Sequence, residues 1–396
     1  MAALQLLSGI KIVSLTQFLL GPVAVQYLAD MGADVIKIEQ PGSGAWERSW
    51  SGGQTYPGGV SAFMLLSHRN VRSVTLNLKD PQAQQIALRM AERCDVLVEN
   101  FRPGVLERLG LGYGVVRERN PRVVYASASG YGSDSPYRDL PGQDLLVQAI
   151  SGLASITGRA SEAPIAAGAP IVDQHGAALL AMGILGALFQ RERTGEGQRV
   201  EVTMLQAALD LQLEPLTYYL NGGKLELPRE RIASIFHEAP YGLYQTKDGY
   251  LALSMSPLRT VRQALGDPVE LAPYDDPKVA FEKRDEIRRA LDPFLRRKTT
   301  SEWVSHLRTH GIWCMPVNDY AQVVEDPVVQ HVDPILEVDH PRAGRVKLLK
   351  HPVSYGSGAP VVERLGPELG EHTDEVLREL GLSAEEIARL RESGSV

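Results

Sequence analysis

The sequence predicts an α/β protein with a parallel sheet in a large N-terminal domain and a second, smaller α+β domain. Short apolar segments alternate with helical patterns through the first half of the chain, which is typical of a parallel sheet with helical crossovers. The pattern changes after residue 203, and the length of 396 residues exceeds that of one ordinary domain.

The first half of the chain supplies the elements of the expected sheet. Its apolar, strand-like segments lie at 10–15, 34–39, 73–78, 95–101 and 122–127. Helical patterns cover 22–31, which begins with a proline, and 81–93. Ligands of parallel sheets bind at the carboxyl ends of the strands. We therefore expect a binding edge formed by residues 16–21, 39–44, 77–79, 100–104 and 127–132.

The second half predicts a linker, a small domain and a return segment. Residues 205–220 read as helical with a break near Pro215. We expect a large domain at 1–220, a polar linker at 221–231, a small domain at 232–321 and a return segment at 322–396. Expected elements of these parts are a hairpin around 247–249 and helices at 281–294, 374–380 and 384–392.

Composition excludes several classes of protein. The formal net charge of −7 argues against a general nucleic-acid-binding surface. The two cysteines, Cys94 and Cys314, form no CxxC pair, and the nine histidines include no HExxH, so no metal is expected. The most apolar helical stretch, 176–189, is too short to span a bilayer. We expect a cytoplasmic protein without membrane or nucleic-acid partners.

Known nucleotide and hydrolase motifs are absent from the expected ligand edge. The first strand-to-helix turn reads TQFLLGP and lacks the GxGxxG of a dinucleotide site, although Glu39 ends the second strand as a ribose-binding acid would. No GxxxxGK[ST] occurs, and the segment YASASG at 125–130 is not a GxSxG nucleophile elbow.

One carboxylate has an unusual position. Asp173 stands alone where a Gly/Pro loop meets the apolar helical segment, and no other acid follows it until Glu192. Asp is a preferred N-cap and complements the helix dipole, so the local pattern favours a capping role. An ionised carboxylate at this junction could also act as a nucleophile.

Seven motifs in order resemble the class III CoA-transferases, a family that includes formyl-CoA transferase, carnitine CoA-transferase and alpha-methylacyl-CoA racemase. The motifs are LLGPVAVQYLADMGADVIKIEQPGSG (19–44), NVRSVTLNLK (70–79), DVLVENFRPGVLERLGL (95–111), NPRVVYASASGYG (120–132), PGQDLLVQAISGL (141–153), IVDQHGAALLAMGILGAL (171–188) and LGEHTDEVLRELGL (369–382). The resemblance implies a Rossmann-like large domain, C-terminal helices that pack with it, and an interlocked, ring-like homodimer.

The resemblance also implies the chemistry. Asp173 occupies the position of the family's nucleophile, which carries the acyl group as an anhydride and CoA as a thioester. Coenzyme A is then a substrate, exchanged between an acyl-CoA and a carboxylic acid, with no permanently bound cofactor. The residues implied to contact CoA are Leu19, Leu20, Leu76, Asn77, Leu78, Lys79, Asn100, Phe101, Arg102 and Arg108.

Two departures argue against formyl-CoA and oxalate as the specific substrates. Gln40 stands where formyl-CoA transferase has a CoA-contacting Arg, and the glycine-rich loop of that enzyme has no counterpart in 236–249. The resemblance to the family suggests a small dicarboxylic acid as the acceptor, but no residue of the sequence indicates which acid it is.

The rival activity within the family is racemisation. Racemases use a His–Asp pair, and their His is replaced here by Gln143, followed by Asp144. Glutamine is no general base, which favours transfer. Gln143 is expected to donate hydrogen bonds near the thioester, and Asp144 to hold the loop or the second substrate; both could instead only satisfy loop backbone. His175 reads as a first-turn helix residue that points away from Asp173.

Overall fold

A computed structural model describes residues 3–230 and 234–396. The chain forms two compact units: the first comprises Met1–Val147, Pro170–Ala208 and Asp333–Val396, and the second Gln148–Ala169 and Leu209–Val332. The expected large domain ended at residue 220, but 148–169 and 209–220 group with the second unit. The reason is local bonding, since Ser151 and Gln212, and Ala160 and Pro228, share hydrogen bonds. The expected junction between linker and small domain, at 231–232, lies outside the described residues.

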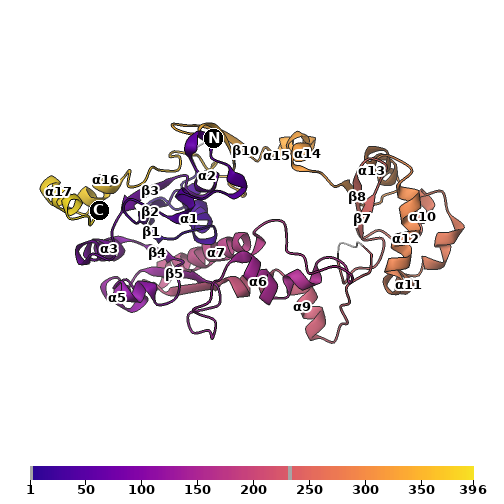
Figure 1. The fold of residues 1–396 in the computed structure, drawn as a ribbon, viewed down its shortest axis with the longest axis horizontal. Helices are drawn as coiled ribbons and strands as arrows, with labels where there is room; N and C mark the ends of the chain where they lie inside the picture. The colour runs from indigo at the N-terminus through magenta and orange to yellow at the C-terminus, as the bar shows by residue number, and fades with distance from the viewer. Residues whose placement is uncertain (1–2, 231–233) are drawn as a thin grey trace. The chain divides into compact units, whose positions relative to one another are not determined.

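The first unit contains a six-stranded parallel sheet (Figure 1). Its strands are β1 (Lys11–Leu15), β2 (Asp34–Glu39), β3 (Val71–Thr75), β4 (Val96–Glu99), β5 (Val124–Ser129) and β6 (Arg199–Thr203). The spatial order β3-β2-β1-β4-β5-β6 is that of a doubly wound fold, and it reverses direction between β1 and β4. The five expected strands are confirmed as β1 to β5, with ends that differ by at most three residues, and β6 is a sixth strand at the segment where the pattern changes.

Helices cover both faces of this sheet. The helices of the first unit, of which α6 and α8 extend into the second unit, are α1 (Leu20–Asp30), α2 (Ala62–Ser67), α3 (Pro81–Arg93), α4 (Val105–Arg108), α5 (Tyr113–Arg119), α6 (Asp144–Ile150), α7 (Ile171–Thr194), α8 (Met204–Asp210), α16 (Thr373–Glu379) and α17 (Ala384–Glu392). One apolar core joins strand residues such as Leu15 and Leu97 to α3, α5, α16 and α17. The C-terminal helices therefore pack with the large sheet, and a separate hairpin, β10 (Ile335–His340) and β11 (Gly344–Leu349), precedes them.

On the other face, α7 lies beside α1 and packs on β5 and β6 (Figure 1). Gly176 of α7 allows this close approach, because a Cβ at this position would lie 2.6 Å from the Leu20 side chain. The contact links the turn after β1 to the N-terminal end of α7.

The expectation that the apolar stretch is too short to cross a bilayer is wrong. The helix runs over 24 residues, Ile171–Thr194, and it is long and apolar enough by length and composition to span a membrane. The core helix of a protein passes the same test, and 44% of its most apolar window is buried within the protein. Near its C-terminal end, buried Arg191 pairs with Asp95 at 2.9 Å.

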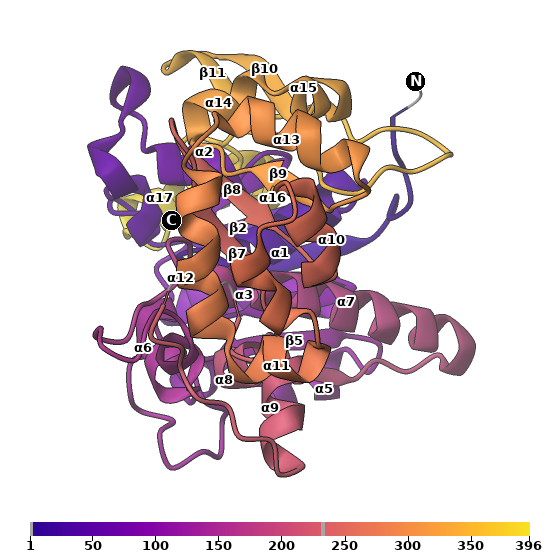
Figure 2. The same ribbon diagram turned by 90° about the vertical axis from the view of Figure 1, so that its right-hand side faces the viewer.

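The second unit has its own core around a three-stranded sheet (Figure 2). The strands are β7 (Gly242–Gln245), β8 (Tyr250–Leu253) and β9 (Cys314–Pro316), and the first two form the expected hairpin. Its helices are α9 (Leu213–Leu220), α10 (Leu258–Ala264), α11 (Pro277–Glu282), α12 (Arg284–Leu295), α13 (Thr300–Thr309), α14 (Tyr320–Glu325) and α15 (Pro327–Val332).

Two helical expectations need correction. The break in the segment 205–220 falls at residues 211–212, between α8 and α9, and Pro215 lies in the first turn of α9. Proline fits there because its missing N–H is unpaired in a first turn anyway. The expected helix at 281–294 is two helices, α11 and α12, that meet at Lys283.

Candidate active site

The site forms where the strand order of the sheet reverses. Asn100 follows β4, and its side chain binds both backbone groups of Gln17 after β1: Oδ1 accepts the N–H and Nδ2 donates to the carbonyl, each at 2.8 Å. These two bonds tie together the turns that flank the reversal point, where doubly wound sheets bind ligands.

A cavity of about 520 Å³ opens at this point, entirely within the first unit. This volume lies within the range of about 300–1,000 Å³ that is usual for small-molecule sites. It brings together eight of the predicted site residues: Leu19, Leu20, Asn100, Phe101, Arg102, Gln143, Asp144 and Asp173.

Asp173 is the third residue of α7 and does not cap that helix. Pro170 is the N-cap residue and makes no side-chain cap bond. The cap comes from Asp144, whose Oδ2 accepts the N–H groups of Val172 at 2.9 Å and Asp173 at 3.0 Å. The capping role that the local pattern favoured for Asp173 therefore belongs to Asp144, and the Asp173 carboxylate is left facing the cavity.

The environment of Asp173 makes its carboxyl group harder to ionise. Burial, together with the smaller effect of the nearby negative charge of Asp144, raises the pKa of Asp173 to about 7. A carboxylate with a raised pKa is more basic, and the group still ionises near neutral pH.

A close backbone contact positions Gln143 and Asp144. Gly142 lies against Gly130 at the end of β5, so that a Cβ on Gly142 would be 2.4 Å from the Gly130 Cα atom. Only glycine at both positions allows this approach. The contact holds the 141–144 loop next to the start of α7.

The other predicted CoA residues lie outside the cavity lining. Gln40 follows β2 and is exposed, and Asn77, Leu78 and Lys79 follow β3. Leu76 is buried in the sheet core, so only its backbone could reach a ligand. Arg108 is on α4, and its Nη1 lies near Gly104. These residues continue the same edge of the sheet beyond the cavity.

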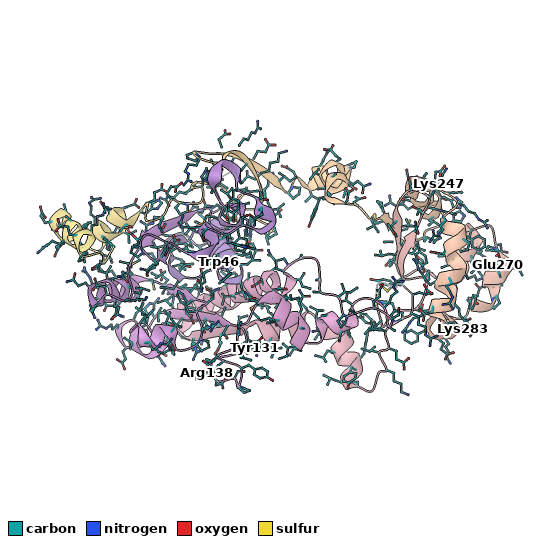
Figure 3. All side chains as sticks on the ribbon, viewed as in Figure 1. Trp46, Tyr131, Arg138, Lys247, Glu270 and Lys283 are labelled. Carbon is teal, nitrogen blue, oxygen red and sulfur yellow. The ribbon has the colours of Figure 1, made fainter. Side chains whose placement is uncertain are left out.

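The sequence reasoning placed Gln17 and Phe18 at the expected binding edge without giving them a role, and it did not single out four other residues that line the cavity: Trp46, Trp50, Phe63 and Arg138. Figure 3 labels Trp46 on the segment after β2 and Arg138 on the loop after β5. The segment AWERSW could have indicated part of this site from the sequence, because two tryptophans in a polar loop seldom serve only to fill a core.

Buried charged side chains hold the segment that carries Trp46 and Trp50 in place. Glu47 is fully buried and lies 2.5 Å from Lys37 Nζ, which also lies 2.7 Å from Nε2 of His68. Burial and the neighbouring Lys37 charge lower the pKa of His68, while the Lys37 charge and the His68 contact keep the pKa of Glu47 well below its usual range. Glu47 Oε2 also accepts the N–H of Phe18 at 3.1 Å.

A second buried ion pair fixes Arg48, the residue that follows Glu47. Arg48 donates two hydrogen bonds of 2.6 Å to Glu39 at the end of β2, and Ser73 donates a third at 2.7 Å. Despite opposing burial, these contacts and the nearby Lys37 charge lower the pKa of Glu39 to about 2. Glu39, the apparent ribose-binding acid of the sequence, thus serves as an anchor for Arg48.

No histidine lines the cavity in the described part of the chain. Across residues 3–230 and 234–396, no group of three or more His, Cys, Asp or Glu side chains is arranged to hold a metal ion. The ionisable groups facing the cavity are therefore Asp144, Asp173, Arg102 and Arg138.

Solved structures share this fold with high similarity. A CaiB/BaiF family protein from Brucella suis superimposes with a TM-score of 0.82 at 26% identity, covering 94% of this chain and 98% of that chain. The fold is thus that of a CaiB/BaiF family protein.

The sequence comparisons identify the family. Residues 7–373 match CoA-transferase family III, and the chain belongs to that family. It is 33% identical to the human succinyl-CoA:glutarate CoA-transferase over 94% of this chain and 86% of that protein. It is 32% identical to the formyl-CoA:oxalate CoA-transferase of Rhodopseudomonas palustris over 98% of this chain and 97% of that protein. The chain is therefore a CoA-transferase-family enzyme that uses CoA thioesters, as expected.

Proposed function

We propose that this protein moves CoA from an acyl-CoA to a free carboxylic acid, with Asp173 as the covalent carrier. The observation that supports this most directly is that two different carboxylates have two different roles at the start of α7. Asp144 supplies the helix cap, so the carboxylate of Asp173 remains available in the cavity. An ionised carboxylate needs no general base to attack a thioester.

The first half of the reaction loads the enzyme. A carboxylate oxygen of Asp173 attacks the thioester carbonyl, the carbon–sulfur bond breaks, and CoA thiolate leaves a mixed anhydride. The thiolate then attacks the aspartyl carbonyl of the anhydride and releases the original acid as its carboxylate. CoA is now held as a thioester of Asp173.

The second half repeats these steps in reverse. The carboxylate of the acceptor acid attacks the aspartyl thioester and expels CoA thiolate, which forms a second anhydride. The thiolate attacks the acceptor's carbonyl, giving the new acyl-CoA and a free Asp173. Bonds of similar energy are exchanged, so positioning and stabilisation of the tetrahedral oxyanions must provide the rate.

The amide groups of Val172 and Asp173 are unsuitable as oxyanion donors, because both already donate to Asp144. Gln143 lines the cavity and carries a side-chain NH₂ group. We propose that it donates to the substrate carbonyl, while Asp144 acts by holding the helix start.

We further propose that CoA extends along the carboxyl edge of the sheet. Leu19, Leu20, Asn100, Phe101 and Arg102 would contact its thiol arm in the cavity. Beyond the cavity, the same edge offers Gln40, Leu76, Asn77, Leu78, Lys79 and Arg108 to the nucleotide end. A cationic rim there suits the phosphates of CoA.

Racemisation is the alternative within the family, and the cavity lining argues against it. Deprotonation next to a thioester needs bases on both faces of the carbon, and the described lining offers carboxylates and Gln143 but no imidazole. Exchange of the α-proton of a branched acyl-CoA in heavy water, without any acceptor acid, would favour the racemase.

We propose an interlocked homodimer that works in the cytoplasm. Large apolar side chains are exposed on the first unit at Met182 and Phe189, which are 62% and 68% exposed. Such exposure is typical of an assembly surface. Both cysteines are free and buried, which fits a reducing compartment. Sedimentation equilibrium tests the dimer.

Peptide mass mapping tests the covalent carrier. After exposure to succinyl-CoA and quenching with hydroxylamine, we expect the peptide that contains Asp173 to carry a hydroxamate. The variant Asp173→Asn keeps the size of the side chain and removes the nucleophile, so transfer should fall by ~10³-fold or more. Transfer that continues in Asp173→Asn, or turnover with an unmodified site, would contradict the proposal.

A further inference from the structure

Four aromatic rings form a continuous wall of the active-site cavity. Phe18 packs against Trp46 with ring centroids 4.7 Å apart, and Trp46 stacks on Trp50 at 4.7 Å with an interplanar angle of 22°. Trp50 meets Phe63 edge to face at 5.3 Å. All four line the same cavity as Asp173, and we call them the aromatic wall.

The wall is exposed although its supports are buried. Phe18, Trp46 and Trp50 are 38%, 42% and 39% exposed. Water contact with large rings is unfavourable, and a contiguous exposed patch of this kind usually marks a binding surface. The rings therefore face the cavity without filling a core.

The supports fix the rings in place. Trp46 lies between Ala45 and Glu47. The backbone N–H of Ala45 donates to Glu39, and the side chain of Glu47 pairs with Lys37. Trp50 is tied by its carbonyl, which accepts a 2.6 Å hydrogen bond from the Ser61 hydroxyl.

Phe18 is held in a backbone conformation that L-residues rarely adopt. Its φ is 62°, and its N–H donates to the buried carboxylate of Glu47. A strained, non-glycine residue of this kind persists only where the surroundings impose it, and such residues cluster at ligand sites. The wall is thus preformed, which reduces the entropy lost when a ligand binds.

We propose that the aromatic wall receives the organic group of the carboxylic acid substrate, and that this acid carries an aryl ring or a comparably bulky apolar group. The proposal rests on the proposed function. In that reaction the donor acyl group and the acceptor acid occupy the same place in turn, because both form an anhydride with Asp173. One wall then serves both acids.

The chemistry of the wall favours this occupant over a small dicarboxylate. The ring faces offer stacking and apolar contact but no positive charge for a second carboxylate, and the indole N–H groups of Trp46 and Trp50 are their only donors. The two cavity arginines, Arg102 and Arg138, follow β4 and β5, on segments other than those that carry the wall. The adenine of CoA could also stack on a ring, but the pantetheine arm separates it from the thioester that must meet Asp173.

Competition between two acceptors tests the proposal. With succinyl-CoA as donor, kcat/KM is measured for 3-phenylpropionate and for glutarate. We expect the native enzyme to prefer 3-phenylpropionate by at least ~10-fold. In Trp46→Ala this preference should fall by ~10-fold or more, and Trp46→Leu, which keeps apolar volume without the ring face, should lie between the two.

The matched control is Phe281→Leu, a change at a 39% exposed phenylalanine of α11 in the second unit. It should leave the preference unchanged. If Asp173 becomes acylated and glutarate is preferred in the native enzyme and in Trp46→Ala alike, the substrate class is wrong while the proposed function stands. If no donor acylates Asp173 and no acid accepts CoA, the proposed function itself fails.

Discussion

Asp144 caps the helix on which Asp173 lies, and its charge acts on the same carboxyl group whose backbone it binds. Oδ2 of Asp144 accepts the Asp173 N–H at 3.0 Å, and the negative charge helps to raise the pKa of Asp173. One residue therefore both positions the candidate nucleophile and adds to the effect of burial on the pH at which it ionises. These two effects can be separated by substitution.

The pH dependence of acylation should report on Asp173. Because only the carboxylate attacks, the rate of Asp173 acylation should rise with pH and level off above about 7, the pKa to which burial and Asp144 raise this group. Asn can still accept the helix N–H groups, so Asp144→Asn removes the charge and keeps the cap. Its profile should shift to lower pH, as measured by single-turnover acylation with acyl-CoA in excess.

Glu99 is the group that could confuse this measurement. Burial raises its pKa to about 8, and it is the last residue of β4, directly before Asn100, although it does not line the cavity. If the rate followed the ionisation of Glu99, it would change over the same pH range in Asp144→Asn as in the native enzyme. An unshifted profile in that variant would therefore remove Asp173 as the titrating group.

Asp173 should also make the protein less stable at neutral and higher pH. Its pKa is about 7 in the native state and about 4 in the unfolded chain. The native state therefore holds an extra proton between these values, and the free energy of unfolding falls as pH rises from about 4 to about 7. Asp173→Asn removes this loss, so the variant should gain stability relative to the native protein as the pH increases.

Denaturant unfolding at fixed protein concentration, at pH 4.5 and pH 8, measures this effect. Asp139→Asn is the control, since the Asp139 side chain is 87% exposed. The difference between Asp173→Asn and native protein should be larger at pH 8, whereas the control difference should be the same at both pH values. Equal differences for Asp173→Asn would show that its carboxyl is not buried as the structure has it.

The sequence predicted those parts of the fold that local patterns specify. Strands such as β2 and helices such as α3 and α17 have strong periodicity with capping or proline signals at their ends, and their predicted bounds match the structure. The break at 211–212 was misplaced because Pro215 looked like a helix breaker, whereas a first turn accepts proline.

The site could be predicted only in part, for a physical reason. Asp173 and its likeness to a family nucleophile are local features, but its cap comes from Asp144, 29 residues earlier. The aromatic wall likewise depends on buried polar side chains in three separate segments, at Lys37, Glu47 and His68. No local pattern encodes such long-range polar contacts. The roles of the CoA residues stay predictions.

The buried network under the wall should be important for stability. In Glu47→Gln, Lys37 would remain buried without its opposite charge, and removing one partner of a buried pair costs about 3–5 kcal/mol. The exposed pair Arg119–Glu92 is the control, because Glu92→Gln should cost less than about 1 kcal/mol. Both values follow from urea unfolding. A Glu47→Gln loss as small as the control's would show that Lys37 and His68 re-pair without Glu47.

The glycine contact behind the cap should be required for activity as well as for stability. Ala at position 142 would place its Cβ 2.4 Å from the Gly130 Cα atom, so the 141–144 loop must move. Asp144 would then lose its bonds to the start of α7, a cap worth about 1 kcal/mol. We expect Gly142→Ala to unfold at lower denaturant and to acylate Asp173 at least ~10-fold more slowly.

The matched control for this change is Gly114→Ala. Gly114 lies within α5, and a Cβ there would meet no atom within 4 Å. Alanine is the better helix former by about 0.5–1 kcal/mol, so Gly114→Ala should be neutral or slightly stabilising, with normal acylation. Because both variants add one methyl group, a difference between them isolates the backbone contact. If Gly142→Ala acylates as fast as Gly114→Ala, the loop adjusts without moving Asp144, and the cap does not depend on the glycine pair.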